Sequence, residues 1–315
     1  MTNNRMEEEP SAQKIKHIVI NGGGPLLFNM YGALKQSNKK KIWNYEDVET
    51  YYGTSAGAIL ATLMVLKYDW DELDNYIINR PWQHVLKFNI LEIFDYYTNN
   101  GITDIKLINE FFSPLLKAKD ISTDVTFAEF KQINGAGLCV YSTEFATLSI
   151  KEFSAENTPN VKVLEAVYAS SALPILLKPI QIENKTYIDG SICLNYPLAK
   201  CLEKNIDPQT VLGIKNKYPE IETMKIENMN MFEYMTSLVF SLFTKMEYAE
   251  KIANNTGNQC TDGVKEILVS STPGDFSKFF KLASCKEERQ NAIEKGVEDA
   301  NCLQPFSQSF PNCHS

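Results

Sequence analysis

The sequence predicts an α/β fold built on a largely parallel sheet. A short apolar segment, 17–20, runs directly into three glycines at 22–24 and then into an apolar helical stretch. A second strand-like segment, 48–52, leads through a glycine turn into an Ala- and Leu-rich stretch, 56–66. The order of strand, glycine turn and helix thus occurs twice, which is typical of parallel strands with helices on the faces of their sheet.

The composition fits one globular domain and argues against nucleic-acid binding. Of 315 residues, 44% are hydrophobic, which is enough to bury a core. With 31 Lys and Arg against 39 Asp and Glu, the net charge is −8, whereas proteins that coat DNA or RNA are usually basic. We see no repeat or Pro/Gly/Ser-rich linker. We therefore expect one domain over residues 15–300, a disordered segment at 1–14 and a tail at 301–315.

Cysteine usage and hydropathy favour an intracellular protein. The seven cysteines are widely spread and form no CxxC motif, which is typical of free thiols in a reducing compartment. Residues 1–16 contain three consecutive glutamates and lack the apolar centre of a secretory signal. The longest nearly apolar run, 56–66, is shorter than the roughly 20 residues of a transmembrane helix. We expect a cytoplasmic protein without a transmembrane segment, peripheral to membranes at most.

Further strands and helices are predicted along the rest of the chain. Helices are expected at 71–79, 103–116, 161–171, 197–204 and 229–254, and strands at 138–142, 147–153, 180–182, 186–188, 210–214 and 267–270. The strands 180–182 and 186–188 are joined by a hairpin-like turn, and the second leads directly into Asp189 and Gly190. This order places Asp189 at the end of a strand.

A nucleophilic serine is predicted within Gly53-Thr54-Ser55-Ala56-Gly57. In a nucleophile elbow, a GxSxG sequence lies at a strained turn between a strand and a helix, and small flanking residues let the backbone turn tightly. The N-terminus of the following helix then faces the negative charge that develops during attack. The strand, turn and helix pattern around Ser55 favours this interpretation over a structural glycine turn that happens to contain serine.

The base that would activate Ser55 is predicted to be Asp189 rather than a histidine. Of the three histidines, His17 begins the first strand, His84 follows the serine too closely, and His314 lies in the tail. None of them occupies the strand-to-loop position that a Ser, Asp, His order would require. The dipeptide Asp262-Gly263 precedes the last strand and is interpreted as a surface turn.

Gly22, Gly23 and Gly24 are candidates for an oxyanion hole. Glycines after a strand expose consecutive backbone N–H groups that can bind an oxyanion. A dinucleotide-binding fingerprint fails because Leu27 stands at its third glycine position, and no Gly-Lys-Ser/Thr follows to make a phosphate loop. A simple tight turn is the remaining alternative.

Taken in order, these motifs resemble the patatin-like phospholipases, also called patatin-like lipid acyl hydrolases. The resemblance runs from about residue 16 to 200. Its motifs are the glycine loop at 22–24, the elbow at 53–57, the sequence ASSALP at 169–174, and Asp189-Gly190-Ser191 followed by Asn195 and Pro197. In one place the chain departs from the pattern, since the glycine loop continues with Pro25, Leu26 and Leu27 where the family usually has a small residue, Arg or Lys, and Gly.

The resemblance implies a three-layer α/β/α sandwich and a Ser–Asp dyad without histidine. It implies that Ser55 is the nucleophile, Asp189 the base, and the backbone of Gly22, Gly23 and Gly24 the oxyanion hole. Gly53 and Gly57 belong to the elbow, while Gly190, Asn195 and Pro197 support the motif around the base. The implied reaction is hydrolysis of carboxylic esters in phospholipids or other acyl lipids, with no cofactor and no metal.

Two other functions stay open at the level of sequence. An acyltransferase that uses an alcohol in place of water would carry the same motifs, and a catalytically weak lipid-binding or regulatory protein could keep the same fold. The segment 231–246 is rich in Met, Phe and Leu and is compatible with a core helix, the lining of an acyl pocket or transient contact with a membrane surface.

Overall fold

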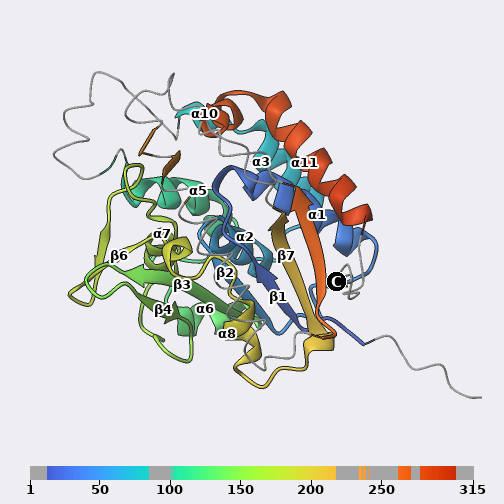
Figure 1. Cartoon of the computed structure of the whole chain (residues 1–315), viewed down its shortest axis with the longest axis horizontal. Coiled ribbons are helices and arrows are strands. Elements are labelled where there is room, and N and C mark those ends of the chain that lie inside the picture. The colour runs from blue at the N-terminus through green and yellow to red at the C-terminus, as the bar shows by residue number, and fades with distance from the viewer. Residues whose placement is uncertain are drawn as a thin grey trace, which may run out of the picture.

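The computed structural model describes residues 13–84, 101, 103–217, 234–235, 237–238, 241, 262–270 and 277–302. Most of the predicted helix at 229–254, most of the predicted N-terminal segment, nearly all of the predicted tail, and His314 lie outside these residues. The described residues form one mixed sheet with helices packed on it, so the predicted α/β class with a largely parallel sheet is confirmed (Figure 1).

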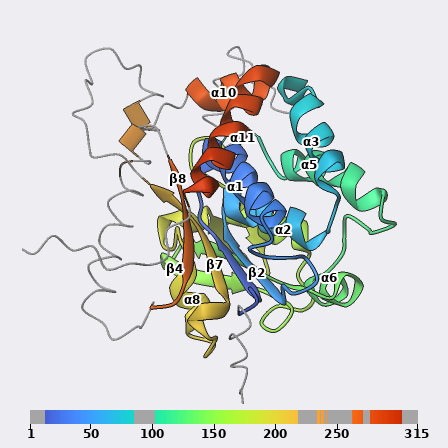
Figure 2. The ribbon, with the colours of Figure 1, turned by 90° about the vertical axis from the view of Figure 1, so that its right-hand side faces the viewer.

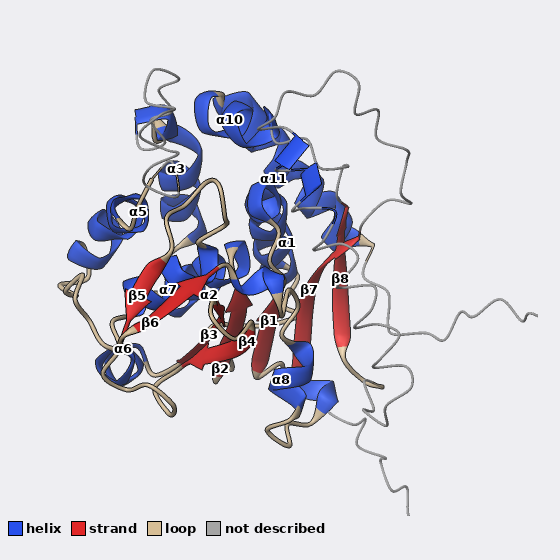
Figure 3. Ribbon diagram, turned by 60° about the vertical axis from the view of Figure 1, so that its left-hand side comes forward, coloured by secondary structure: helices blue, strands red, loops and turns tan. Residues whose placement is uncertain are grey.

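The sheet has the strand order β5-β6-β3-β2-β1-β7-β8, with β4 paired to β3 outside this path. The strands are β1 (His17–Ile20), β2 (Thr50–Thr54), β3 (Gly137–Glu144), β4 (Ser149–Phe153), β5 (Ile180–Ile182), β6 (Lys185–Ile188), β7 (Val211–Lys217) and β8 (Lys265–Ser270). The central strands β3, β2, β1, β7 and β8 pair in parallel, whereas β4, β5 and β6 pair antiparallel. Figure 3 shows β5 and β6 at one end of the sheet and β8 at the other.

The helices of the described residues lie between these strands or follow the last of them. They are α1 (Leu27–Lys39), α2 (Ala56–Val65), α3 (Trp70–Asn79), α5 (Lys106–Lys117), α6 (Phe127–Asn134), α7 (Val163–Ser171), α8 (Leu198–Leu202), α10 (Ser277–Ser284) and α11 (Lys286–Asn301), with short 3-10 helices η1 (Gly24–Leu26), η2 (Trp82–His84), η4 (Gly190–Ile192) and η5 (Pro208–Thr210). None of the helices in the described part of the chain is long and apolar enough to cross a membrane.

The two faces of the sheet are covered unequally. On one face, β1 and β7 contribute Ile18, Ile20, Leu212 and Ile214 to a large core that also includes side chains of α1, α2, α5 and α7. On the other face, alternate residues of the same strands pack in a smaller core with α8. Because side chains alternate along a strand, a central strand must be apolar throughout to serve both cores. Within the described residues, the layer on this second face of the sheet is thinner than the layer on the first face.

Two glycines allow α1 and α11 to pack backbone against backbone. A Cβ atom on Gly32 would lie 2.1 Å from the carbonyl oxygen of Ile293, and one on Gly296 would lie 1.8 Å from that of Asn29. Figure 2 shows the two helices side by side. A side chain at either glycine would force the helices apart, so this contact depends on both positions.

Candidate active site

The predicted site residues meet at one edge of the sheet. In the parallel pairing, Ile20 of β1 lies opposite Gly53 of β2 and Ile214 of β7, so these strands end together. The glycine loop follows β1, and Ser55 follows β2. Asp189 follows β6, which pairs with the part of β3 that extends beyond the end of β2. The register alone therefore brings the three motifs to the same place.

Ser55 has the backbone conformation of a strained strand-to-helix turn. Its φ of 53° and ψ of −121° are rare for a residue with a side chain. Its N–H donates to Ser170 Oγ at 2.8 Å. A Cβ on Gly53 would lie 2.4 Å from the Gly57 carbonyl oxygen, and one on Gly57 would lie 2.3 Å from that of Ile20. The close approach of three backbone segments requires the glycines that flank the serine.

Ser55 and Asp189, which are 134 residues apart in the chain, form a direct hydrogen bond. The Ser55 hydroxyl donates to Asp189 Oδ2 at 2.8 Å. The other carboxylate oxygen, Oδ1, accepts from the Ser191 N–H at 2.8 Å. The backbone of Asp189 is also held, because its N–H donates to the Ala172 carbonyl and its carbonyl accepts from Thr143 Oγ1. These contacts hold both the side chain and the main chain of Asp189, so its carboxylate is kept in an orientation toward Ser55.

Burial makes Asp189 a stronger base than an ordinary aspartate. Its exposed fraction is 2%, and that of Ser55 is 8%. Loss of water raises the pKa of Asp189 to about 6, and hydrogen bonds from the Ser191 amide and the Ser55 hydroxyl oppose a larger rise. A carboxylate with this pKa is ionised at neutral pH and is a better proton acceptor than a solvated one.

The three glycines of the loop after β1 have different roles. The Gly22 N–H donates to the Asn195 carbonyl oxygen at 2.9 Å, and the Gly22 carbonyl accepts from Asn216 Nδ2 at 2.6 Å. The Gly22 amide is therefore already paired within the chain, and its role as an oxyanion donor stays a prediction. The N–H groups of Gly23 and Gly24 make no hydrogen bond with any described residue, which leaves those two amides as candidate donors.

Gly24 and Leu26 define the shape of this loop. Gly24 has a φ of 49°, a region that glycine enters without the cost a side chain would add. Leu26 stands where the family usually has a cation, and its side chain is partly buried against the larger core. Leu26 is uncharged and its packing contributes to the fold. This position therefore brings no positive charge to the glycine loop.

His17 takes no part in the site. His17 is buried at the start of β1, opposite Thr50, so it lies at the other end of that strand from the glycine loop. Burial lowers its pKa, and its ring packs edge-on against Tyr52. His84 ends η2. His17 forms no hydrogen bond with Ser55 or Asp189.

The residues predicted to support Asp189 lie around it. A Cβ on Gly190 would lie 2.2 Å from the Tyr141 carbonyl oxygen, so the chain turns against β3 at this point. Asn195 holds Gly22 through its carbonyl, and Pro197 immediately precedes α8. Asp262 and Gly263 form a turn before β8, as the sequence predicts, and lie outside the site.

Ser170 is a site residue to which sequence reasoning assigned no role. Its hydroxyl accepts from the Ser55 N–H and donates to the Tyr141 carbonyl, so it links the elbow to β3. Ser142 Oγ lies 3.1 Å from the Ala169 carbonyl oxygen and 2.8 Å from that of Ile188, which fixes α7 beside β6. The motif at 169–174 contained the signal, but nothing in its spacing showed a contact with residue 55.

Among the described residues, no group of three or more His, Cys, Asp or Glu side chains is arranged to hold a metal ion.

The fold and the Ser55–Asp189 pair define a class of α/β protein in which a strand-to-helix turn presents a serine to a buried carboxylate. The family model of patatin-like phospholipases matches residues 18–202, a range that includes the glycine loop, the elbow and Asp189. The chain belongs to the patatin-like phospholipase family.

Viral and bacterial proteins are similar to this chain. An uncharacterized protein, R571, of Acanthamoeba polyphaga mimivirus is 23% identical over 254 residues, which cover 80% of this chain and 83% of that protein. A probable lipid hydrolase, 463L, of Invertebrate iridescent virus 6 is 28% identical over 185 residues, covering 58% of this chain and 62% of that protein. The crystal structure of VipD from Legionella pneumophila shares the fold, with a TM-score of 0.54 and 14% identity over 92% of this chain and 67% of VipD.

Proposed function

We propose that this protein is a serine hydrolase that cleaves carboxylic esters of phospholipids or related acyl lipids. The hydrogen bond of 2.8 Å between Ser55 Oγ and Asp189 Oδ2 carries the proposal, because it pairs a hydroxyl on a strained turn with a buried base. Membership of the patatin-like phospholipase family and similarity to a probable lipid hydrolase support a lipid ester as the substrate.

In the first half of the reaction, Ser55 Oγ attacks the ester carbonyl carbon and its proton passes to Asp189. The carbonyl oxygen becomes an oxyanion, for which the amides of Gly23 and Gly24 and the N-terminus of α2 are the candidate partners. As the tetrahedral intermediate collapses, the bond to the alcohol breaks and the alcohol oxygen takes the proton from Asp189. The acyl group is then bound to Ser55 as an ester.

In the second half, water attacks the carbonyl carbon of the acyl-enzyme. Asp189 takes a proton from the water and returns it to Ser55 Oγ as the acyl bond breaks, which releases the fatty acid and restores the hydroxyl. Asp189 accepts a proton in both halves, so it must be ionised at the start of each. Its pKa of about 6 permits this at neutral pH.

The proposal is tested by labelling the full chain with a fluorophosphonate, which reacts covalently with an activated serine. We expect one label, located on Ser55 by mass spectrometry of the digested protein. Ser37 of α1 is a buried serine hydroxyl outside the site, so Ser37→Ala is a matched control that should keep the label. An unlabelled but folded parent protein would favour the lipid-binding alternative.

Product analysis separates hydrolysis from acyl transfer. The acyl-enzyme is common to both, and only the nucleophile of the second half differs. With a phospholipid substrate and added glycerol, we expect free fatty acid as the main product. Acylglycerol as the main product would assign the chain to the acyltransferases.

A further inference from the structure

The tip of the hairpin between β3 and β4 is apolar, exposed and uncharged. All six residues of 145–150, with the sequence FATLSI, are exposed. Phe145 and Leu148 are each 59% exposed, and Ile150 is 39% exposed. Isolated exposed apolar side chains are normal on protein surfaces, but three of the eight large apolar side chains that are exposed among the described residues fall within these six positions. We call residues 145–150 the hairpin tip.

The turn itself does not account for a leucine at position 148. Its φ is 50°, a conformation in which a side chain costs about 1 kcal/mol and which glycine or asparagine adopts more readily. Its side chain is not buried, so it does not recover this cost by packing in the folded chain. A binding partner outside the chain would account for an exposed leucine at position 148.

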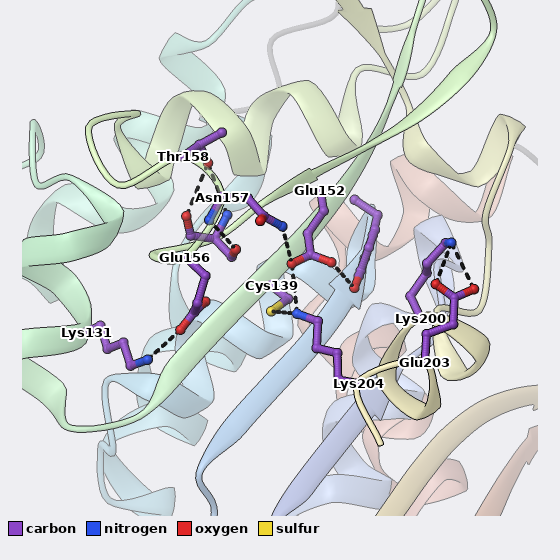
Figure 4. A network of polar contacts seen from close by, with 11 residues as sticks. Lys131, Cys139, Glu152, Glu156, Asn157, Thr158, Lys200, Glu203 and Lys204 are labelled. Atoms are coloured by element: carbon purple, nitrogen blue, oxygen red, sulfur yellow. Dashed lines mark hydrogen bonds and ion pairs between the residues drawn. The ribbon is translucent and has the colours of Figure 1, made fainter. Parts of the chain in front are cut away.

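The base of the hairpin is held firmly, in contrast to its tip. Glu152 of β4 accepts hydrogen bonds from Tyr141, Asn157 and Lys204, at 2.8, 2.9 and 2.8 Å. Lys204 also approaches Cys139 Sγ of β3 at 3.4 Å, so one network joins β3, β4 and the chain after α8 (Figure 4). The tip therefore projects from a braced support.

The same hairpin contacts the segment that carries Asp189. Thr143 of β3 pairs with Ile188 and donates to the Asp189 carbonyl at 2.9 Å. Cys193, four positions after Asp189, lies with its Sγ 3.1 Å from the Leu148 carbonyl oxygen. Phe145 is two positions beyond Thr143, or roughly 7 Å along the strand. The separation between the start of the hairpin tip and the segment that carries Asp189 is therefore shorter than one acyl chain.

We infer that the hairpin tip docks on the surface of a lipid bilayer and places the proposed active site at that surface. This inference rests on the proposed function, since an acyl-lipid substrate resides in such a surface. Phe145, Leu148 and Ile150 would enter the boundary between headgroups and acyl chains, where apolar side chains are favoured. Because the tip carries no charge, it suits a zwitterionic or neutral surface.

A second copy of the chain is a poorer occupant than a bilayer. A stable protein interface needs about 800 Å² from each partner. Three partly exposed side chains offer much less than this, because a whole aromatic side chain buries only about 150–250 Å². Docking on a bilayer has no such minimum area, because a few inserted side chains can act together with the binding of a substrate lipid at the active site.

The test compares the full chain with a double variant, Phe145→Ser with Leu148→Asn. Asparagine tolerates the positive φ at position 148, so the turn is preserved. Ile133→Ser is the matched control, because Ile133 is 56% exposed on α6 and lies outside the tip. Binding to phosphatidylcholine vesicles is measured by flotation, and hydrolysis is measured on the same vesicles and on monomeric p-nitrophenyl butyrate.

We expect the double variant to lose at least about tenfold in vesicle binding and vesicle hydrolysis, since insertion of apolar side chains drives interfacial binding. Its rate on the monomeric ester should stay within about a factor of two, and the control should match the parent on all three measurements. Unchanged vesicle binding by the double variant, or a parent that does not bind vesicles, would overturn the docking site.

Other outcomes distinguish this inference from the proposed function. A parent that hydrolyses neither substrate contradicts the proposed function, yet loss of vesicle binding in the double variant would still support the docking site. An equal loss on the monomeric ester would mean that the tip shapes the active site, which overturns docking. A dimer in the parent that light scattering finds dissociated in the double variant would identify the tip as a protein interface instead.

Discussion

Ser55 and Leu148 have nearly the same backbone φ, 53° and 50°, in opposite surroundings. Ser55 is 8% exposed, with its amide bound by Ser170 and its hydroxyl bound by Asp189. Leu148 is 59% exposed at the hairpin tip. A strained conformation persists where its neighbours determine it, as at Ser55. At Leu148 the strain lies in an open turn, so substitutions there should alter binding to a surface rather than the fold.

The largest expected effect is at the buried turn. Ser55→Ala removes the nucleophile and should lower ester hydrolysis by roughly 10³-fold or more, as loss of a catalytic serine does in other serine hydrolases. Alanine occupies less space than serine, so the thermal unfolding midpoint should change little. The measurement is kcat/KM on p-nitrophenyl butyrate together with thermal unfolding. Activity within a factor of two of the parent would exclude Ser55 as the nucleophile.

Asp189→Asn should lower the rate by roughly 10²–10⁴-fold, because an amide cannot accept the serine proton. In the parent, kcat/KM should fall as the pH drops below about 6, where Asp189 becomes protonated. A pH–rate profile with this acid limb in the parent is the check. A parent whose rate is flat from about pH 7 to 5 would contradict a base with this pKa.

Asp189→Asn should also raise the free energy of unfolding at neutral pH. Between the ordinary aspartate pKa of 3.8 and about 6, the folded chain retains a proton that the unfolded chain releases, so stability falls as the pH rises through this range. The difference corresponds to about 3 kcal/mol for this buried carboxyl. Denaturant unfolding at about pH 8 should therefore show Asp189→Asn to be more stable than the parent, with the gap closing toward about pH 4. If Asp189→Asn were less stable than the parent at about pH 8, the cost of burying the ionised carboxylate would be contradicted.

Gly57→Ala sharpens the comparison through stability alone. The new Cβ would lie 2.3 Å from the Ile20 carbonyl oxygen, a backbone atom that cannot move without shifting β1. We expect a loss of about 3 kcal/mol or more in the free energy of unfolding, although alanine favours helices. Gly135→Ala is the matched control, since its φ is 75° but nothing lies within 4 Å of the new Cβ. Its cost should be about 1 kcal/mol.

The smallest effect is expected at the exposed turn. Leu148→Gly relieves the positive φ and adds freedom to the unfolded chain, and these effects nearly cancel. The free energy of unfolding should stay within about 1 kcal/mol of the parent value. Urea unfolding checks this, and a loss much larger than that would show that Leu148 packs against the fold.

Short-range patterns predicted most elements close to their observed bounds. The strand at 17–20 matches β1, and the helix predicted at 56–66 matches α2. The second strand was predicted at 48–52 but is Thr50–Thr54, because parallel pairing with β3 extends to Thr54. Apolar composition shows that a strand is present, whereas its end depends on the neighbouring strand.

Three helices of the described residues, α6, α10 and α11, were missed, and two of them show different reasons. α6 has a local signal, since Thr126 and Glu129 form a reciprocal capping box at its start. α11 is largely polar, and its position depends on Gly32 and Gly296, which allow it to approach α1. The first could be found by inspecting the sequence, whereas the second required the partner helix.

The sequence by itself determined the chemistry that is available: a serine in a GxSxG turn, three glycines after a strand, and an aspartate at the end of another strand. These follow from local backbone preferences within a few residues. Only the tertiary structure decided that Ser55 and Asp189 lie 2.8 Å apart, that Gly22 is engaged by Asn195, and that Ser170 holds the elbow. Those contacts join residues far apart in the chain, so strand order, register and burial decide them, and no local pattern records these.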